Sequence, residues 1–237
     1  MPESLSTSLE IALNALPTLL LGALITVQLT AAAVIFGSIG GTLLGIARLS
    51  TFKPLQIASG IYIDFFRGTP LLVQIFMIYF GIPALANGLG TQFTFNRFAA
   101  AILALSLNSA AYLAEIVRGG IQSIESGQSE ASESLGLSPL QTMRYVIFPQ
   151  AFRRMIPPLG NEFITLLKDT SLVAVIGYEE LFRRGQLIVA QNYRAFEIYI
   201  TVALVYLILN TLFARAFVLL ERWMDPVQKA KQQKATV

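Results

Sequence analysis

The chain has 237 residues, of which 54% are hydrophobic and 13% are charged, and its formal net charge is +3. This composition is far more apolar than that of a soluble domain of similar length, so it predicts an integral membrane protein. The absence of cysteine and histidine excludes disulfides, thiolate chemistry and most zinc sites, and we expect no metal site. Basic residues are not clustered with aromatic side chains, so no nucleic-acid partner is expected.

The apolar stretches predict an all-α integral membrane protein with five transmembrane helices and one domain over residues 1–237. No charge occurs between Glu10 and Arg48, which is longer than the roughly 20 apolar residues that a spanning helix needs. No basic region precedes this stretch, so we expect it to be a span and not a signal peptide. The five predicted spans cover residues 18–47, 55–83, 98–119, 159–178 and 196–220.

The first span carries Gly37, Gly41 and Gly45 at four-residue spacing. Such a small-xxx-small pattern lets a second helix approach the backbone closely. The alternative is that these glycines have no specific role in packing. The spacing therefore predicts a helix-packing surface without requiring it.

The second span is interrupted midway by charged and helix-weakening residues. Asp64 and Arg67 are three residues apart and can form a structural ion pair on one helical face. Gly68 and Pro70 then weaken the backbone hydrogen bonding directly after the charges. We expect a buried pair or a water-lined interior here, with direct substrate contact as the weaker alternative.

The third span places Asn108, Tyr112 and Glu115 on one helical stripe. A polar stripe within lipid needs an interior to face, and a carboxylate at membrane depth costs at least a few kcal/mol, which predicts a substrate pathway. The alternative is that Glu115 lies near the inner end and reaches water beside Arg118.

The fourth span has weak hydropathy and includes Thr165, Lys168 and Asp169. Because a lone span of this kind would insert poorly, the other helices must shield it, and it is a candidate wall of a translocation route. Lys168 and Asp169 can instead be a structural ion pair that neutralises itself.

The longest polar passage, residues 120–158, predicts two short helices. One runs from about Ile121 to Leu135 and ends at Gly136. The other begins after Ser138, whose hydroxyl can form a capping box with Gln141, and should run to about Phe148. These helices have too few apolar positions to span lipid and too many for a free linker. The passage therefore predicts a docking site for a protein partner.

The distribution of lysine and arginine predicts the orientation in the membrane. Most of them fall in the loop after the first span, in residues 118–154 and after residue 221, which places these segments in the cytoplasm and the N-terminus outside. Arg183 and Arg184 run against this rule.

Several stretches resemble a known family. Glu130-Ala131-Ser132, Gly136 and Val146-Ile147-Phe148-Pro149 resemble the cytoplasmic signature of the permease subunits of binding-protein-dependent ATP-binding-cassette importers. Ser132, Val146 and Phe148 are mild departures from the usual alanine, isoleucine and leucine. The resemblance to the polar amino acid branch of that family rests on three further stretches: Phe66–Gln74, Leu107–Glu115 and Asn161–Leu172.

The resemblance implies a type I importer fold in a bacterial cytoplasmic membrane and a set of partners. These are a second permease copy or a homologous permease, two cytoplasmic ATPase subunits that bind ATP and Mg, an external solute-binding protein and an amino acid substrate. Glu130, Ala131, Gly136 and Leu137 would belong to the coupling helix that docks on the ATPase. The chain itself has no phosphate-binding Gly-x-x-x-x-Gly-Lys-Ser/Thr motif, so we expect neither an enzyme nor a bound cofactor.

The leading interpretation is a permease subunit of an amino acid importer. A self-sufficient secondary carrier or channel for small polar solutes is the alternative, and an integral membrane enzyme would need a nucleophile or metal cluster that the sequence lacks. The charge of the substrate and the choice between homodimer and heterodimer stay open. The candidate pathway residues are Asn108, Tyr112, Glu115, Thr69, Thr165 and Lys168.

Overall fold

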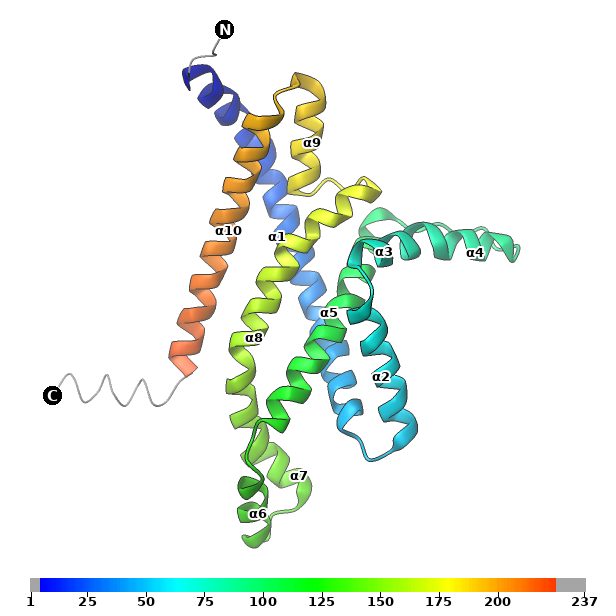
Figure 1. The fold of residues 1–237 in the computed structure, drawn as a ribbon, viewed down its shortest axis with the longest axis vertical. Helices are drawn as coiled ribbons and strands as arrows, with labels where there is room; N and C mark the ends of the chain where they lie inside the picture. The colour runs from blue at the N-terminus through cyan, green and yellow to red at the C-terminus, as the bar shows by residue number, and fades with distance from the viewer. Residues whose placement is uncertain (1–4, 225–237) are drawn as a thin grey trace, which may run out of the picture.

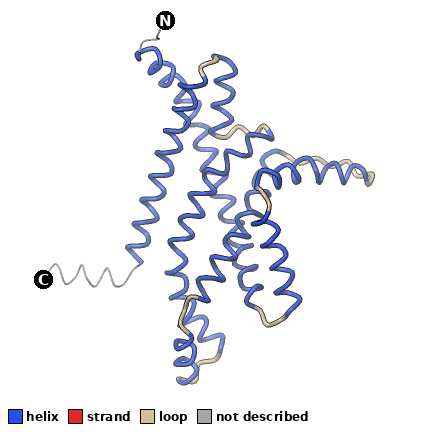
Figure 2. The backbone as a smooth tube through the Cα atoms, viewed as in Figure 1, coloured by secondary structure: helices blue, strands red, loops and turns tan. Residues whose placement is uncertain are grey.

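The computed structural model describes residues 5–224, and these residues are helical with no strand among them (Figures 1 and 2). The long passages are continuous α-helix because they contain few interior breakers, and short π-helical and 3-10 segments connect some of them. Residues 1–4 and 225–237 lie outside the description, and the basic C-terminal segment predicted as cytoplasmic falls mostly there. The elements are α1 Leu5–Leu49, α2 Lys53–Gly68, α3 Leu71–Phe76, a π-helical segment Met77–Gly81, α4 Ile82–Gly88, α5 Arg97–Gln122, α6 Ser126–Ser134, α7 Pro139–Thr142, a second π-helical segment Met143–Ile147, α8 Phe148–Asp169, a 3-10 helix Thr170–Ile176, α9 Leu181–Asn192 and α10 Ala195–Met224.

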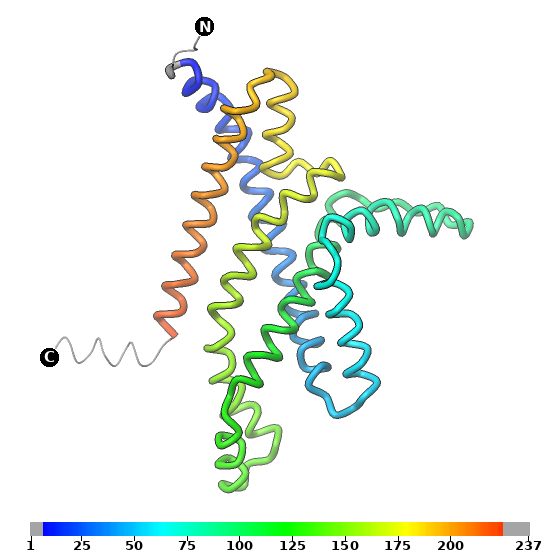
Figure 3. Tube along the Cα trace, viewed as in Figure 1, coloured from blue at the N-terminus to red at the C-terminus, as the bar shows by residue number. Residues whose placement is uncertain are grey.

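One group of helices runs along the length of the molecule, and its successive members point in opposite directions (Figure 3). They are α1, α2, α5, α8 and α10. The arm formed by α3 and α4 crosses this direction, α6 and α7 lie at one end, and α9 lies near the start of α1 at the other end (Figure 1). By length and composition alone, four segments can cross a membrane: Thr7–Leu49, Leu71–Gly88, Arg97–Gln122 and Ala195–Met224.

Two of the predicted spans differ from the observed helices. The stretch 55–83 is not one helix, because α2 ends at Gly68 and the chain turns before α3 begins at Leu71. The predicted weak point at Gly68 and Pro70 is thus confirmed, and the break is complete. The stretch 159–178 belongs to a helix that already begins at Phe148, contains Pro157 and Pro158, and passes into a 3-10 helix after Asp169.

The glycines of α1 form the packing surface against α5. An ideal Cβ on Gly41 would lie 2.6 Å from the Leu113 Cβ, and one on Gly45 would lie 2.8 Å from the Ala114 carbonyl oxygen. Gly37 meets Ser109 in the same way at 3.0 Å. The glycine spacing is therefore confirmed as a close helix contact.

The long helix α1 joins two apolar clusters. Its second half packs with α5, α8 and the arm around the buried Leu29, Leu105 and Leu166. Its first half packs with α9 and α10 around Leu19 and Ile198. The two clusters lie at different positions along α1, so α1 connects them.

A buried carboxylate fastens α9 between α1 and α10. Glu180 is fully buried, and its side chain caps α9 by accepting hydrogen bonds from the backbone N–H groups of Phe182 and Arg183 at 2.9 and 2.8 Å. The hydroxyls of Thr26 in α1 and Tyr206 in α10 donate to Glu180 Oε2 at 3.3 and 2.8 Å. Four donors from three helices therefore converge on one side chain.

Replacing Glu180 with leucine is expected to destabilise the protein by about 1–3 kcal/mol, because four buried or half-buried donors lose their acceptor. Glu180→Gln keeps one oxygen and should cost less. The measurement is the thermal unfolding midpoint of the detergent-solubilised protein, with Glu179→Gln as the matched control, since the Glu179 side chain is 56% exposed. A Glu180→Leu midpoint equal to that of the wild type would refute the fastening role.

Candidate functional site

The candidate site begins at the break between α2 and α3. Thr69 has an extended backbone and ends α2, and Pro70 lacks the N–H that would continue the helix. The Thr69 hydroxyl donates to the Phe65 carbonyl oxygen at 2.8 Å. One of the carbonyls that α2 leaves open at its C-terminus is therefore capped by a side chain from the break itself.

A cavity of about 280 Å³ lies beside this break. Its lining comes from three parts of the chain and includes two carboxylates, an amide and three hydroxyls. The break, α5 and α8 contribute Thr69, Pro70, Leu71, Asn108, Tyr112, Glu162, Thr165 and Asp169. Hydrogen-bond donors, hydrogen-bond acceptors and two acidic groups converge here from three parts of the chain, which suits a small polar solute with an ammonium group.

The cavity brings together four of the six predicted pathway residues: Thr69, Asn108, Tyr112 and Thr165. Glu115 and Lys168 are not among its lining residues. A role for these two in the pathway stays a prediction.

Sequence reasoning did not select Glu162 as a site residue and treated Asp169 only as an ion-pair partner. Both line the cavity together with Thr165. The signal was present, because residues 162, 165 and 169 have the i, i+3, i+7 spacing of one helical face. The competing pairing of Lys168 with Asp169 obscured it.

The ion pairs differ from those predicted. Among the described residues, Arg67 pairs with Glu115 across two helices, with Nη1 3.6 Å from Oε2, and no ion pair joins it to Asp64. The Arg67 guanidinium also lies over the Tyr112 ring, 5.4 Å from its centroid. The pairing with Asp64 was wrong because α5 offers Arg67 a carboxylate and an aromatic ring, whereas Asp64 is exposed.

The second predicted ion pair, Lys168 with Asp169, is likewise absent from the salt bridges of the described chain. Adjacent residues of a helix point in different directions, so the two side chains do not face each other. Lys168 is exposed, whereas Asp169 is half-buried and faces the cavity.

Glu115 is held mainly by its own helix. Arg118 donates to both of its carboxylate oxygens, at 3.0 Å from Nε and 2.7 Å from Nη2. The alternative interpretation of Glu115 beside Arg118 at the end of the span therefore agrees with the geometry. Arg67 adds a longer contact from α2.

The predicted pair of short helices is present at the end of the molecule, with shifted boundaries. The first helix, α6, begins at Ser126 and not near Ile121, because α5 extends to Gln122. The second begins at Pro139 with the predicted capping box of Ser138 and Gln141, but it continues through a π-helical segment into α8 and does not stop near Phe148.

A glycine-dependent motif ends α6. Gly136 has a φ of +80°, its N–H donates to Glu133 O at 2.9 Å, and the N–H of Leu137 donates to Ser132 O at 3.1 Å. Glu130 and Ala131 are exposed on α6, and Leu135 and Leu140 on either side of the turn are 82% and 78% exposed. The hairpin thus presents apolar side chains outward on a defined turn.

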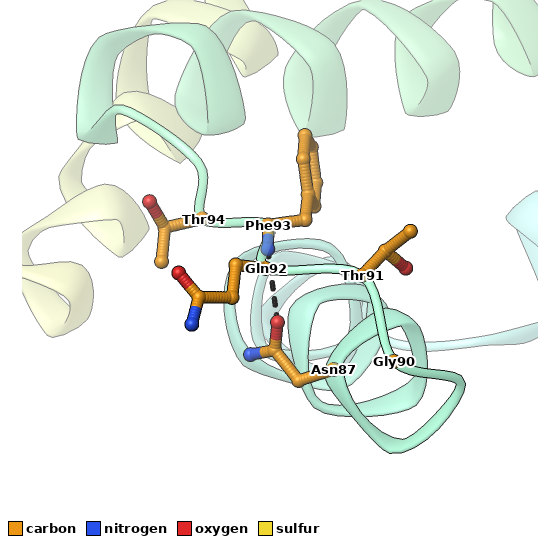
Figure 4. Close-up of a pocket in the computed structure, with 6 residues that line it drawn as sticks. All are labelled: Asn87, Gly90, Thr91, Gln92, Phe93 and Thr94. Atoms are coloured by element: carbon orange, nitrogen blue, oxygen red, sulfur yellow. Dashed lines mark hydrogen bonds between the residues drawn. The ribbon is translucent and has the colours of Figure 1, made fainter.

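A further hollow of about 750 Å³ lies at the tip of the arm, after α4 (Figure 4). The Asn87 side chain shapes this loop by accepting a hydrogen bond from the Phe93 N–H at 2.9 Å. Its lining, Asn87, Gly90, Thr91, Gln92, Phe93 and Thr94, holds no ionisable side chain. The cavity beside α8, with its two carboxylates, is therefore the stronger candidate for recognition of a charged solute.

Curated proteins similar to this chain are amino acid transport proteins. The probable amino-acid permease protein YxeN of Bacillus subtilis (strain 168) is 42% identical over 216 residues, 91% of this chain and 95% of that protein. The glutamine transport system permease protein GlnP of Escherichia coli (strain K12) is 43% identical over 210 residues, 89% of this chain and 94% of that protein. The arginine transport system permease protein ArtQ of Bacillus subtilis (strain 168) is 41% identical over 194 residues, 82% of this chain and 86% of that protein.

A solved structure agrees with these relatives. The crystal structure of an amino acid ABC transporter with histidines contains a chain that is 38% identical and matches with a TM-score of 0.84, over 94% of this chain and 99% of that one. Residues 33–226 match the family described as the inner membrane component of binding-protein-dependent transport systems. This protein therefore belongs to that family of inner membrane transport components.

Proposed function

We propose that this chain is the permease subunit of an ATP-driven importer that carries amino acids across the bacterial cytoplasmic membrane. The observation that carries the proposal is the polar cavity at the broken helix, lined by the break, α5 and α8, in a chain whose relatives are amino acid permeases. Discontinuous helices at membrane depth are a recurrent way to build a substrate site, because their ends present unpaired backbone groups to the solute.

Five transmembrane helices with an external N-terminus and a cytoplasmic C-terminus fit the arrangement of the fold. The five lengthwise helices alternate in direction, so the start of α1 and the end of α10 lie on opposite sides (Figure 3). Neither α2 nor α8 passes the test of length and apolarity. In the proposed topology both cross the membrane because neighbouring helices shield their polar residues, and the arm 71–88 lies across the outer end.

The hairpin of α6 and α7 is the proposed docking site for a cytoplasmic ATPase subunit. Its exposed leucines and the continuous helical connection of α7 to α8 support this role, because a hairpin seated in a groove can transmit domain closure to the attached helices. Two such ATPases would hydrolyse ATP with Mg. A second permease copy or a homologous permease and an external solute-binding protein would complete the complex.

Reconstitution tests the proposal. The chain is co-expressed with an ATPase, a solute-binding protein and a homologous permease of this importer family from its source organism, and the complex is purified and placed in proteoliposomes with radiolabelled glutamine, arginine, histidine or cystine. ATP-dependent uptake of at least one amino acid is the expected result. Uptake by this polypeptide alone, without an ATPase, would overturn the proposal in favour of a secondary carrier or channel.

The cavity carboxylates provide a direct prediction. Glu162→Gln and Asp169→Asn are expected to lower ATP-driven uptake about tenfold or more, because each removes a charged partner of an ammonium group worth about 1.5–3 kcal/mol. Uptake initial rates at matched amounts of complex are the measurement, and Glu179→Gln, outside the cavity, is the control. Wild-type rates in both cavity variants would count against the cavity as the route.

Glu115→Gln in the same assay tests whether a carboxylate outside the cavity also takes part.

A further inference from the structure

A buried amide lies behind the wall of the cavity. Gln74 is 2% exposed and sits in the first helical turn of α3, directly after the break. It does not line the cavity. A neutral polar side chain so deeply buried needs partners for both its N–H₂ group and its carbonyl oxygen.

The N–H₂ group of Gln74 folds back over the break. Its Nε2 atom lies 2.8 Å from the Phe66 carbonyl oxygen, 3.0 Å from the Thr69 carbonyl oxygen and 2.8 Å from the Thr69 hydroxyl. These acceptors belong to the last turn of α2 and to the break, where no backbone N–H is available. In a membrane such carbonyls would otherwise be unsatisfied, so one side chain replaces the hydrogen bonds that the break removes.

The carbonyl oxygen of Gln74 connects the break to α5. It accepts a hydrogen bond from Asn108 Nδ2 at 2.9 Å, and the same Asn108 nitrogen lies 3.4 Å from the Phe66 carbonyl oxygen. Asn108 is itself buried. The amide network therefore joins α2, the break, α3 and α5 at one point.

Two of the three residues that Gln74 bonds, Thr69 and Asn108, are part of the cavity lining. We propose that Gln74 is a positioning residue that fixes these two side chains in the cavity wall and thereby sets the affinity of the permease for its amino acid. This inference rests on the proposed function, because it assumes that the cavity receives the substrate. No group of Gln74 needs to contact the solute for the effect to occur.

Two substitutions test whether the hydrogen bonds of Gln74, and not only the volume of its side chain, matter for amino acid binding. Gln74→Leu removes both the donors and the acceptor, so Asn108 and two carbonyls are left without this partner. Gln74→Glu keeps the shape and an acceptor for Asn108, but it loses the two N–H donors: the ionised group has no donor for the Phe66 and Thr69 carbonyls, and the protonated group has one O–H for three acceptors. We expect each variant to weaken amino acid binding about tenfold, the usual cost of leaving buried hydrogen-bonding groups unpaired.

The readout is equilibrium binding of the radiolabelled amino acid that the wild-type complex transports, measured on the purified permease–ATPase complex without binding protein. Thr201→Val is the matched control, because it removes another buried hydroxyl, bonded to Glu197 O at 2.7 Å, in a helix that contributes nothing to the cavity. Its dissociation constant should equal that of the wild type.

A double variant supplies the second readout. If Gln74 acts through Asn108, then Gln74→Leu combined with Asn108→Ala should weaken binding much less than the product of the two single effects. If the two single effects on the dissociation constant simply multiply in the double variant, then Gln74 does not act through Asn108.

Other outcomes would overturn the inference without touching the proposed function. Gln74→Leu and Gln74→Glu complexes that assemble poorly but bind with wild-type affinity would show a purely structural role. A wild-type complex that imports amino acids but binds none without the binding protein would show that the cavity is only a passage. Failure of the proposed function would instead appear as a wild-type complex without ATP-dependent uptake.

Discussion

Gly41→Ala in α1 is expected to destabilise the protein by about 1–3 kcal/mol, the usual cost of overpacking, although the change adds a single methyl group. The new Cβ would lie 2.6 Å from the Leu113 Cβ, 2.9 Å from the Ala110 carbonyl oxygen and 3.1 Å from the Ala114 nitrogen. Two of these atoms are backbone and cannot rotate away, so α1 and α5 must separate along their length. Because α1 joins both apolar clusters, Gly41→Leu should leave little folded protein.

The matched control is Gly119→Ala in the last turns of α5. A Cβ there meets nothing within 4 Å, so the substitution should be neutral or stabilise the helix through the better helix propensity of alanine. Thermal unfolding midpoints in detergent decide between the two positions. Equal midpoints for the two alanine variants would show that the α1–α5 contact can relax without cost.

Gly136→Val is expected to reduce ATP-driven uptake about tenfold and to lower the amount of ATPase that co-purifies with the permease. A φ of +80° costs an L-residue about 1–2 kcal/mol, and a β-branched residue more, so the turn after α6 would leave the observed conformation in most molecules. An added Cβ would meet no neighbour within 4 Å, so the expected effect comes from the backbone and not from a clash.

Gly136→Asn is the control, because asparagine tolerates the left-handed region better than other residues with a side chain. Uptake, ATP hydrolysis and co-purified ATPase should then be close to wild type. If the valine variant kept wild-type uptake and a full complement of ATPase, the conformation of this turn would have no part in coupling.

Features that depend on neighbours in the sequence were predictable. The capping box at Ser138, the stop at Gly136 and the weak point at Pro70 are all present, because each depends on backbone hydrogen bonds within one turn. Helix ends were harder to predict. Proline disfavours a helix interior, yet α8 begins at Phe148 with Pro149 in its first turn and continues through Pro157.

The interaction partners of individual side chains were predicted less well than the helices themselves. In the sequence, Asp64 was the expected partner of Arg67 because it is three residues away. In the structure, Arg67 pairs instead with Glu115 of α5. Gln74 was part of a recognised stretch but carried no assigned role, because its partners become visible only when α5 is placed against the break. Glu180 is a similar case, since its partner Thr26 is 154 residues away in the chain.

The sequence by itself thus determined that the protein is a helical membrane protein and that a short hairpin follows the third long helix, and it indicated the glycines that the structure places in a close helix contact. Hydropathy, residue spacing and capping are local properties, and local physics is enough to predict them. Only the tertiary structure decided which of the predicted pathway residues share a cavity, that Glu162 and Asp169 join them, and that Gln74 holds the break together. These arrangements depend on the rotation and depth of each helix against its neighbours, and no single helix carries that information in its own sequence.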